Sequence, residues 1–153
     1  MSIAPIVHSV TVKAPPQVAF DLFTAKMGMW WPGKMTLGKN PPVEIAVTPR
    51  VGGKWFQRDA EGNEIQWGKV LAWEPPGRLL LAWQLNTEFA YDPELVTEVE
   101  ITFVPSPTGG TAVTLQHRNL ERLGAGAEKQ ISSLGQGWPT LLGLFAALVD
   151  TQR

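Results

Sequence analysis

His117 is the residue of this sequence with the clearest potential for chemistry. It shares an alternating register with Val113 and Leu115, which places its imidazole on the inward side of a strand, near the strand's end. A histidine in that position can be a core residue satisfied by one hydrogen bond. It can equally be a polar anchor in an apolar pocket that donates, accepts or shuttles a proton near neutral pH. The sequence leaves both interpretations open.

Other catalytic signals are absent from the sequence. It has no glycine-rich nucleotide signature, no GxSxG and no HExxH, and its two histidines are His8 and His117. Without cysteine there is no disulfide framework, thiolate zinc site or cysteine nucleophile. The acidic residues are scattered over the polar sides of predicted strands, and no pair is placed for acid–base work. We therefore predict no catalytic residue set, no metal site and no cofactor.

Seven tryptophans in 153 residues are the more specific signal. Large aromatic side chains fill cores, but they also line ligand cavities. The adjacent Trp30 and Trp31 cannot both point inward from a regular helix, so we expect one of them at a cavity mouth or on the surface. The tryptophans that could converge from different elements on one apolar chamber are Trp30, Trp31, Trp55, Trp67, Trp83 and Trp138.

Short strands between Val43 and His117 must position these side chains. Turn sequences rich in glycine, proline and asparagine separate the strands, and successive strands joined by short turns indicate an antiparallel meander. The predicted strands are 3–13, 43–47, 54–58, 64–74, 78–85, 95–104 and 111–118. Strand 78–85 is apolar throughout, which predicts a central strand or one covered on both faces.

Alternation within two of these strands predicts which side chains share a face. In strand 95–104, Phe103 shares a face with Val99 and Ile101. Strand 64–74 divides into two sets, which are Ile65, Trp67, Leu71 and Trp73 on one face and Gly68, Val70 and Ala72 on the other.

A long amphipathic helix is predicted for 131–149, where apolar residues recur at helical spacing. Its apolar stripe, which includes Trp138 and Leu142, needs a partner surface, and the sheet supplies one. Pro139 lies within the stripe, so the helix should either kink there or become regular only from about Trp138. A shorter helix is predicted at 17–25, after Pro15 and Pro16.

Length and charge narrow the function class. We expect one domain spanning residues 1–153, with 13 basic and 14 acidic residues and a net charge of −1. There is no basic block, which argues against binding nucleic acid or an anionic membrane through bulk charge. The apolar stretches are too short to span a bilayer, and the N-terminus does not have the pattern of a signal peptide. We expect a cytoplasmic monomer or homodimer.

The sequence resembles a known family over nearly its whole length. The segments that carry the resemblance are Val12-Lys-Ala-Pro-Pro16, Val18-Ala-Phe-Asp-Leu-Phe-Thr24, Trp30-Trp-Pro32, Pro49-Arg-Val-Gly-Gly-Lys-Trp55, Gly68-Lys-Val-Leu-Ala-Trp-Glu-Pro-Pro-Gly-Arg-Leu79, Ala82-Trp83, Val99-Glu-Ile-Thr-Phe103, Gly110-Thr-Ala-Val-Thr-Leu-Gln-His117, Gly137-Trp-Pro139 and Leu141-Leu142. They are similar, in order, to the proteins homologous to the activator of the heat-shock-protein-90 ATPase, in the START-like (SRPBCC) superfamily.

That resemblance implies an α+β helix-grip fold, in which a curved antiparallel sheet wraps around a long C-terminal helix and two short helices follow the first strand. Members of the superfamily commonly hold lipids, sterols or polyketides between sheet and helix. We therefore predict a binding or carrier domain for a hydrophobic small molecule, rather than an enzyme. The predicted ligand contacts are Trp30, Trp31, Trp55, Trp67, Trp83, Phe103, His117, Trp138 and Leu142. Two alternatives stay open: a co-chaperone that stimulates a chaperone ATPase, and a cyclase- or hydrolase-like enzyme that uses His117.

Overall fold

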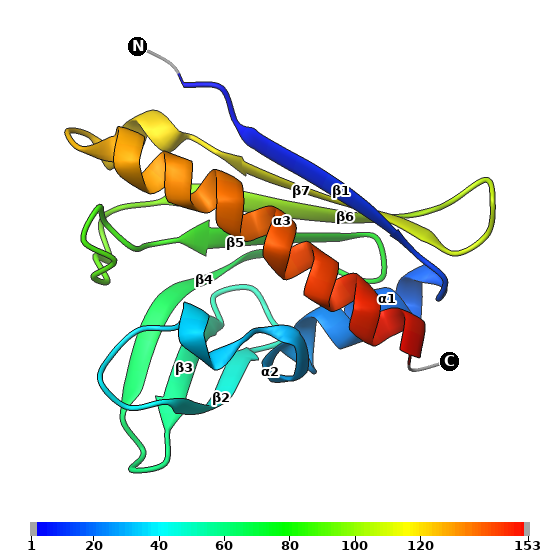
Figure 1. Cartoon of the computed structure of the whole chain (residues 1–153), viewed down its shortest axis with the longest axis horizontal. Coiled ribbons are helices and arrows are strands. Elements are labelled where there is room, and N and C mark those ends of the chain that lie inside the picture. Colours follow the sequence, from blue (N-terminus) through cyan, green and yellow to red (C-terminus); the bar gives the residue numbers. More distant parts are fainter. Residues whose placement is uncertain (1–2, 152–153) are drawn as a thin grey trace.

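The computed structural model describes residues 3–151 and contains one seven-stranded antiparallel sheet, with a long C-terminal helix lying across its inner face (Figure 1). The strand order is β1-β7-β6-β5-β4-β3-β2. The elements are β1 (Ile6–Val12), α1 (Pro16–Thr24), α2 (Met27–Trp30), the 3-10 turn η1 (Gly33–Met35), β2 (Pro42–Val47), β3 (Lys54–Asp59), β4 (Glu64–Glu74), β5 (Arg78–Trp83), β6 (Thr97–Pro105), β7 (Thr111–Arg118), η2 (Leu120–Leu123) and α3 (Ala127–Thr151). The predicted helix-grip fold is confirmed.

The inner face of the sheet is apolar because the strands near its centre follow the predicted alternation. β5 is the fourth of the seven strands, as its apolar sequence predicts, and Leu79, Leu81 and Ala82 are buried on its two faces. Along β6 and β7 every second residue is buried, and Phe103 and His117 belong to these inward sets. The core therefore lies between the sheet and α3.

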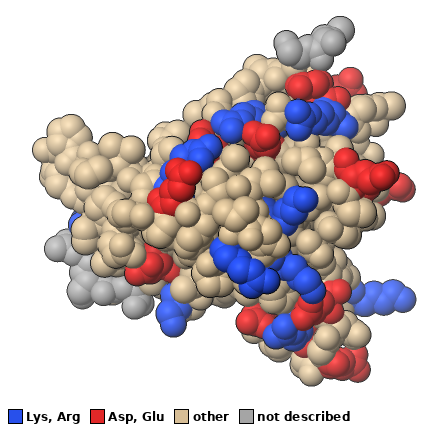
Figure 2. Space-filling model, turned by 180° about the vertical axis from the view of Figure 1, so that it is seen from behind, with Lys and Arg blue, Asp and Glu red and all other residues tan. Residues whose placement is uncertain are grey.

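The outer face of the sheet is charged. Figure 2 shows lysine and arginine interleaved with aspartate and glutamate on this side of the molecule. Arg118 lies 2.9 Å from Glu98 and 3.1 Å from Glu100, and Arg78 lies 2.6 Å from Glu100. Since the charges gather on the outer face, the apolar surface that could hold a ligand is on the inner one.

Strand β4 does not keep the alternation predicted for it. Two β-bulges shift its register, so that Trp67 and Leu71 have no residue directly opposite on the neighbouring strand. Each bulge adds one residue to the strand and thereby reverses the inward and outward positions that follow. Trp67, Gly68 and Val70 are all buried, whereas Leu71 is half-buried. The prediction that Trp67 and Leu71 share one face, opposite Gly68 and Val70, is therefore wrong.

The adjacent tryptophans are both buried, with 5 % of Trp30 and 6 % of Trp31 exposed. α2 ends at Trp30, and Trp31 has an extended backbone with φ −84° and ψ 116°. The two indoles therefore leave the chain in different directions and both reach the interior. Neither indole lies on the surface, because the regular helix that the expectation assumed ends at Trp30. The other position expected for one of the pair, at a cavity, is the one that Trp31 takes.

Helix α3 is continuous from Ala127 to Thr151 and passes through Pro139. It begins eleven residues before Trp138, so the alternative in which regular helix starts only near Trp138 is wrong. Its buried face includes Leu134, Trp138 and Leu142. Trp138 is thus held near the middle of a helix that is packed along its length.

Substitution of Gly68 tests the packing that this fold requires. Gly68 lies in register between Trp55 and Trp83, and a Cβ on it would overlap the carbonyl oxygen of Ala82. Because backbone has to move to relieve that overlap, we expect Gly68→Ala to lower the free energy of unfolding by about 3 kcal/mol, measured by urea denaturation. The control is Gly77→Ala, whose Cβ would meet no atom within 4 Å. Equal free energies of unfolding for the two variants would contradict the close approach of Gly68 to the backbone of Ala82.

Candidate functional site

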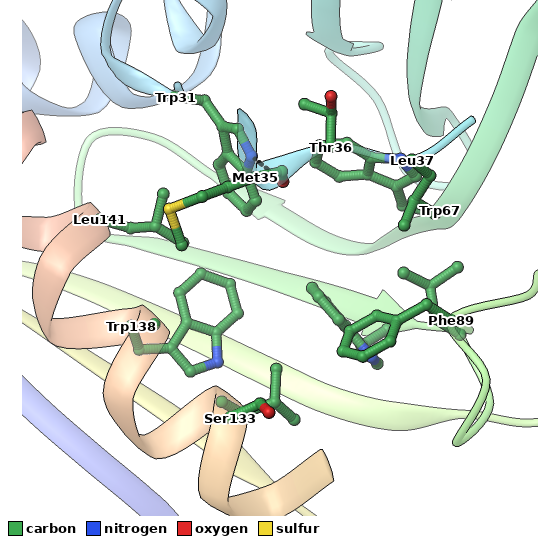
Figure 3. A pocket seen from close by; sticks show the side chains of 13 residues that line it. Trp31, Met35, Thr36, Leu37, Trp67, Phe89, Ser133, Trp138 and Leu141 are labelled. Carbon is green, nitrogen blue, oxygen red and sulfur yellow. Dashed lines mark hydrogen bonds between the residues drawn. The ribbon is translucent and has the colours of Figure 1, made fainter. Parts of the chain in front are cut away.

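An apolar cavity of about 280 Å³ lies between α3, the sheet and the segment that follows α2 (Figure 3). None of the described residues that line it carries an ionisable side chain. The lining residues are Trp31, Met35, Thr36, Leu37, Trp67, Trp83, Leu85, Phe89, Ser133, Leu134, Gly137, Trp138 and Leu141. A cavity of this size is just below the range typical of small-molecule sites, roughly 300–1,000 Å³.

Tryptophan rings form much of the cavity wall. Trp31 and Trp67 lie on one side and Trp138 on the other, with Leu141 and Phe89 at opposite ends (Figure 3). The ring centroids of Trp31 and Trp67 are 4.9 Å apart, and those of Trp31 and Trp138 are 5.9 Å apart at an interplanar angle of 87°. Such tilted and edge-to-face arrangements are the favoured geometry for aromatic pairs, so the rings support one another.

The orientation of these rings is fixed by hydrogen bonds from their indole N–H groups. A buried indole N–H normally needs a partner, and each partner here holds one ring in one position. The bonds are Trp31 Nε1 to the Met35 carbonyl oxygen at 2.9 Å, Trp67 Nε1 to Gln57 Oε1 at 3.0 Å, and Trp138 Nε1 to His117 Nδ1 at 3.1 Å. The orientations of these three tryptophan rings in the cavity wall are therefore fixed in the protein without a ligand.

His117 acts as the acceptor that fixes Trp138. Its Nδ1 faces Trp138 Nε1, and its Nε2 lies 2.8 Å from Thr97 Oγ1. An indole nitrogen can only donate, so Nδ1 must be unprotonated and the neutral imidazole carries its proton on Nε2. Thr97 Oγ1 in turn donates to the Trp83 carbonyl oxygen at 3.2 Å. Complete burial lowers the pKa of His117 to about 3, so the ring stays neutral.

Four of the residues predicted from sequence to contact a ligand line the cavity, and five do not. Trp31, Trp67, Trp83 and Trp138 form its wall. Trp55 lies behind the wall, with its ring centroid 5.6 Å from both Trp67 and Trp83. The other four, which are Trp30, Phe103, His117 and Leu142, are buried in the surrounding core.

Part of the wall comes from a segment that sequence analysis did not connect with the site. We call residues 33–37 the strap. Gln57 is 2 % exposed and holds the strap through both atoms of its amide, because Nε2 donates to the Leu37 carbonyl oxygen at 2.7 Å and Oε1 accepts from the Leu37 N–H at 2.8 Å. Gln57 is visible in the sequence as a polar residue within the predicted strand 54–58, but the sequence does not show that its partner is Leu37.

The cavity is open at its rim. Phe89 is 36 % exposed, and Ser133 is exposed on α3. Both were missed at the sequence level, because Phe89 lies in an irregular loop and Ser133 on the polar side of the predicted helix. By contrast, Leu134 and Leu141 belong to the predicted apolar stripe of α3, which extends along the cavity wall.

Residues 3–151 contain no group of three histidine, aspartate or glutamate side chains close enough to hold a metal ion. None of the helices in this range is both long and apolar enough to cross a membrane.

The curved sheet, the C-terminal helix across it and the apolar cavity between them define a ligand-binding domain of the START-like class. Within that class, the chain belongs to the family of Activator of Hsp90 ATPase homolog 1-like proteins, which matches residues 13–150. This confirms the family predicted from the sequence motifs. No curated protein sequence matches the chain.

Solved structures include close relatives of the whole chain. An anthrahydroquino-γ-pyrone synthase, Txn09, is 35 % identical, with 97 % of this chain and 98 % of that one covered and a TM-score of 0.68. The self-sacrificing resistance protein CalC from Micromonospora echinospora is 30 % identical, with 97 % and 96 % covered and a TM-score of 0.74. The Aha1 dimer from Colwellia psychrerythraea shares the fold at 18 % identity, with 97 % of each chain covered and a TM-score of 0.68.

Burial of His117 predicts a specific acid sensitivity. Its pKa is about 3 in the folded protein and 6.5 ordinarily, so the unfolded state binds more protons below pH 6.5 and stability falls as the pH falls toward 3. At pH 5 the expected loss is about 2 kcal/mol relative to pH 7, because each pH unit below the unfolded pKa costs about 1.4 kcal/mol. Urea denaturation at several pH values measures how the free energy of unfolding changes with pH.

The matched variant for this pH dependence is His117→Gln, whose side chain keeps a hydrogen-bond acceptor for Trp138 but does not titrate. His8 is present in both proteins, so the difference between their pH profiles isolates His117. Identical profiles for the two proteins would show that His117 is not held neutral by burial.

Proposed function

We propose that this protein binds a flat, uncharged, apolar small molecule of aromatic or polyketide type in the cavity between α3 and the sheet. The observation that carries the proposal is the cavity itself, which has four tryptophans in its wall and no ionisable side chain in its lining. A ligand there would exchange water for aromatic and aliphatic surface, which is favourable in proportion to the apolar area buried.

The wall chemistry also limits what can bind. A charged group placed in the cavity would lose its hydration and find no counter-charge, which is costly. Thr36 and Ser133 supply the hydroxyl groups in the lining, and Ser133 lies at the exposed rim. An uncharged ligand with any polar substituent directed toward the mouth fits this distribution best.

The two relatives with at least 30 % identity support this ligand class. The name of the synthase Txn09 describes a fused aromatic pyrone product, and CalC is described as a self-sacrificing resistance protein. Both are matched over nearly their whole length. Binding of a fused aromatic compound is therefore consistent with the chemistry named for a relative and with the walls of this cavity.

The geometry favours binding over a reaction that uses His117 as an acid or a base. Both imidazole nitrogens are engaged, by Trp138 and Thr97, and the residue is not part of the cavity lining. A general acid or base must come within hydrogen-bonding distance of the atom on which it acts. His117 instead serves the site as the support of one wall.

Filling the cavity tests the proposal. Gly137 lines it, and a Cβ there would lie 3.5 Å from Met35 Cε, so the rest of a leucine side chain would occupy ligand space. We expect Gly137→Leu to weaken binding of the neutral fluorescent probe N-phenyl-1-naphthylamine at least tenfold. The measurement is a titration of probe fluorescence, together with quenching of tryptophan emission.

Gly135→Leu is the matched control, because Gly135 lies on the same helix, is exposed and has no atom within 4 Å of an added Cβ. Both substitutions raise helix propensity by a similar amount, so neither should unfold the protein. The proposal fails if the wild-type protein binds neither the probe nor any member of a panel of neutral polycyclic aromatics. It also fails if the two variants bind the probe equally well.

A further inference from the structure

Two irregular segments frame the mouth of the cavity, and they are attached to the protein in different ways. One is the strap, residues 33–37. The other, which we call the rim loop, is residues 86–93 between β5 and β6. Figure 1 shows both segments at the same end of the sheet, near the N-terminal half of α3. The inference below concerns how a ligand reaches the cavity, and so it rests on the proposed function.

The strap is tied to other elements along its length. Gln57 on β3 makes two hydrogen bonds to the backbone of Leu37, at 2.7 and 2.8 Å. The indole of Trp31 donates to the Met35 carbonyl oxygen at 2.9 Å. Gln57 Oε1 also accepts from Trp67 Nε1, so moving the strap would disturb a wall of the cavity. These contacts make the strap the fixed side of the mouth.

The rim loop is tied to residues outside it toward its ends, where Tyr91 forms an antiparallel bridge with Leu85 and the Asp92 N–H donates to the Gln84 carbonyl oxygen at 2.8 Å. Two buried glutamines hold it, since Gln84 Nε2 donates to the Pro93 carbonyl oxygen at 3.0 Å and Gln130 Nε2 on α3 donates to the Asn86 carbonyl oxygen at 2.8 Å. The amide oxygen of each glutamine is buried without a hydrogen-bond partner among the described residues. Each therefore contributes one hydrogen bond, whereas Gln57 contributes both of its amide groups.

The tip of the rim loop is organised by bonds to its own first residue. The N–H of Phe89 donates to the Asn86 carbonyl oxygen at 2.9 Å, and the N–H groups of Glu88 and Ala90 donate to Asn86 Oδ1 at 2.8 and 3.1 Å. The tip can therefore move as one unit about Asn86 and Pro93 without breaking these bonds. Residues 88–91 are all exposed, as expected of a segment with few contacts.

Phe89 connects this tip to the cavity. Its side chain reaches inward from the rim loop, across the cavity from Leu141 (Figure 3). Its backbone has φ 56°, in the left-handed region that a bulky residue seldom adopts. A strained backbone is maintained only when other contacts hold it, and here the hydrogen bonds to Asn86 hold the turn around Phe89. The closed position of Phe89 thus combines a strained backbone with a partly exposed ring.

We propose that Phe89 is the gate of the cavity, and that the tip of the rim loop swings outward about Asn86 and Pro93 to admit a ligand while Gln57 holds the strap in place. A gate residue limits the rate at which a site opens, so its removal speeds both association and dissociation. A residue that only contacts the ligand changes mainly the dissociation rate. The two roles are therefore distinguishable by kinetics.

Stopped-flow fluorescence with N-phenyl-1-naphthylamine separates these roles. We expect Phe89→Ala to raise the association rate constant at least fivefold and to raise the dissociation rate constant as well. The matched variant on the strap is Met35→Ala, which should change Kd and leave the association rate constant within twofold. An unchanged association rate in Phe89→Ala, or a faster one in Met35→Ala, would overturn the proposal.

Amide hydrogen exchange tests the gate without a ligand, so it stands even if the probe fails to bind. The swing would break the hydrogen bond from the Asp92 N–H to the Gln84 carbonyl oxygen, so we expect the Asp92 N–H to exchange at least tenfold faster than the N–H of Leu37 in the wild-type protein. Gln57→Leu should accelerate exchange at Leu37 and leave the rim loop unchanged. Equal protection of the two segments in the wild-type protein would show that the rim loop is as fixed as the strap, and would refute the gate. Failure of probe binding alone would refute the proposed function.

Discussion

Burial of the apolar face of α3 against the inner face of the sheet is the interaction on which both the fold and the cavity depend. The helix cannot be stable by itself over this sequence, and the sheet cannot leave its inner face in water. The C-terminal half of α3 is closely packed: Leu142 and Phe145 are fully buried, and the ring centroid of Phe145 lies 5.2 Å from that of Phe23 and 5.4 Å from that of Trp30. Farther toward the N-terminal half of α3, Gly137 and Trp138 border an open space instead. The cavity is thus the part of a shared core that side chains do not fill.

Two buried polar side chains orient tryptophans of the cavity wall. His117 accepts from Trp138, and Gln57 accepts from Trp67, and both acceptors are almost completely buried. Each indole has a single donor, so one acceptor is enough to select its orientation. A binding site whose walls are fixed in this way loses less conformational entropy when it takes up a ligand. The same burial keeps His117 neutral, and the neutral form is the one that accepts from Trp138.

Backbone irregularities bring side chains from regular strands into the site. The bulge at Trp67 allows this indole to join the buried set of β4 beside Gly68. Gly68, in turn, leaves room for Trp55 and Trp83 to meet across the strand with their ring centroids 5.6 Å apart. The strap and the rim loop complete the cavity with residues that belong to neither helix nor sheet. The sheet and α3 hold these two segments in position through Gln57, Gln84 and Gln130.

The sequence by itself determined the order of the elements, the antiparallel meander, the apolar stripe of α3 and the inward register of Phe103 and His117. These follow from periodicity and turn residues, which act over a few neighbouring positions. It also identified the aromatic set from which the cavity wall is drawn. Only the tertiary structure decided that Trp31 and Trp67 line the cavity, whereas Trp30 and Trp55 lie behind it. That division depends on where α2 ends and where β4 bulges, and on the pairing of Gln57 with Leu37, twenty residues away in the chain. Contacts between distant segments produce no periodic pattern of residue types, so only the folded structure shows them.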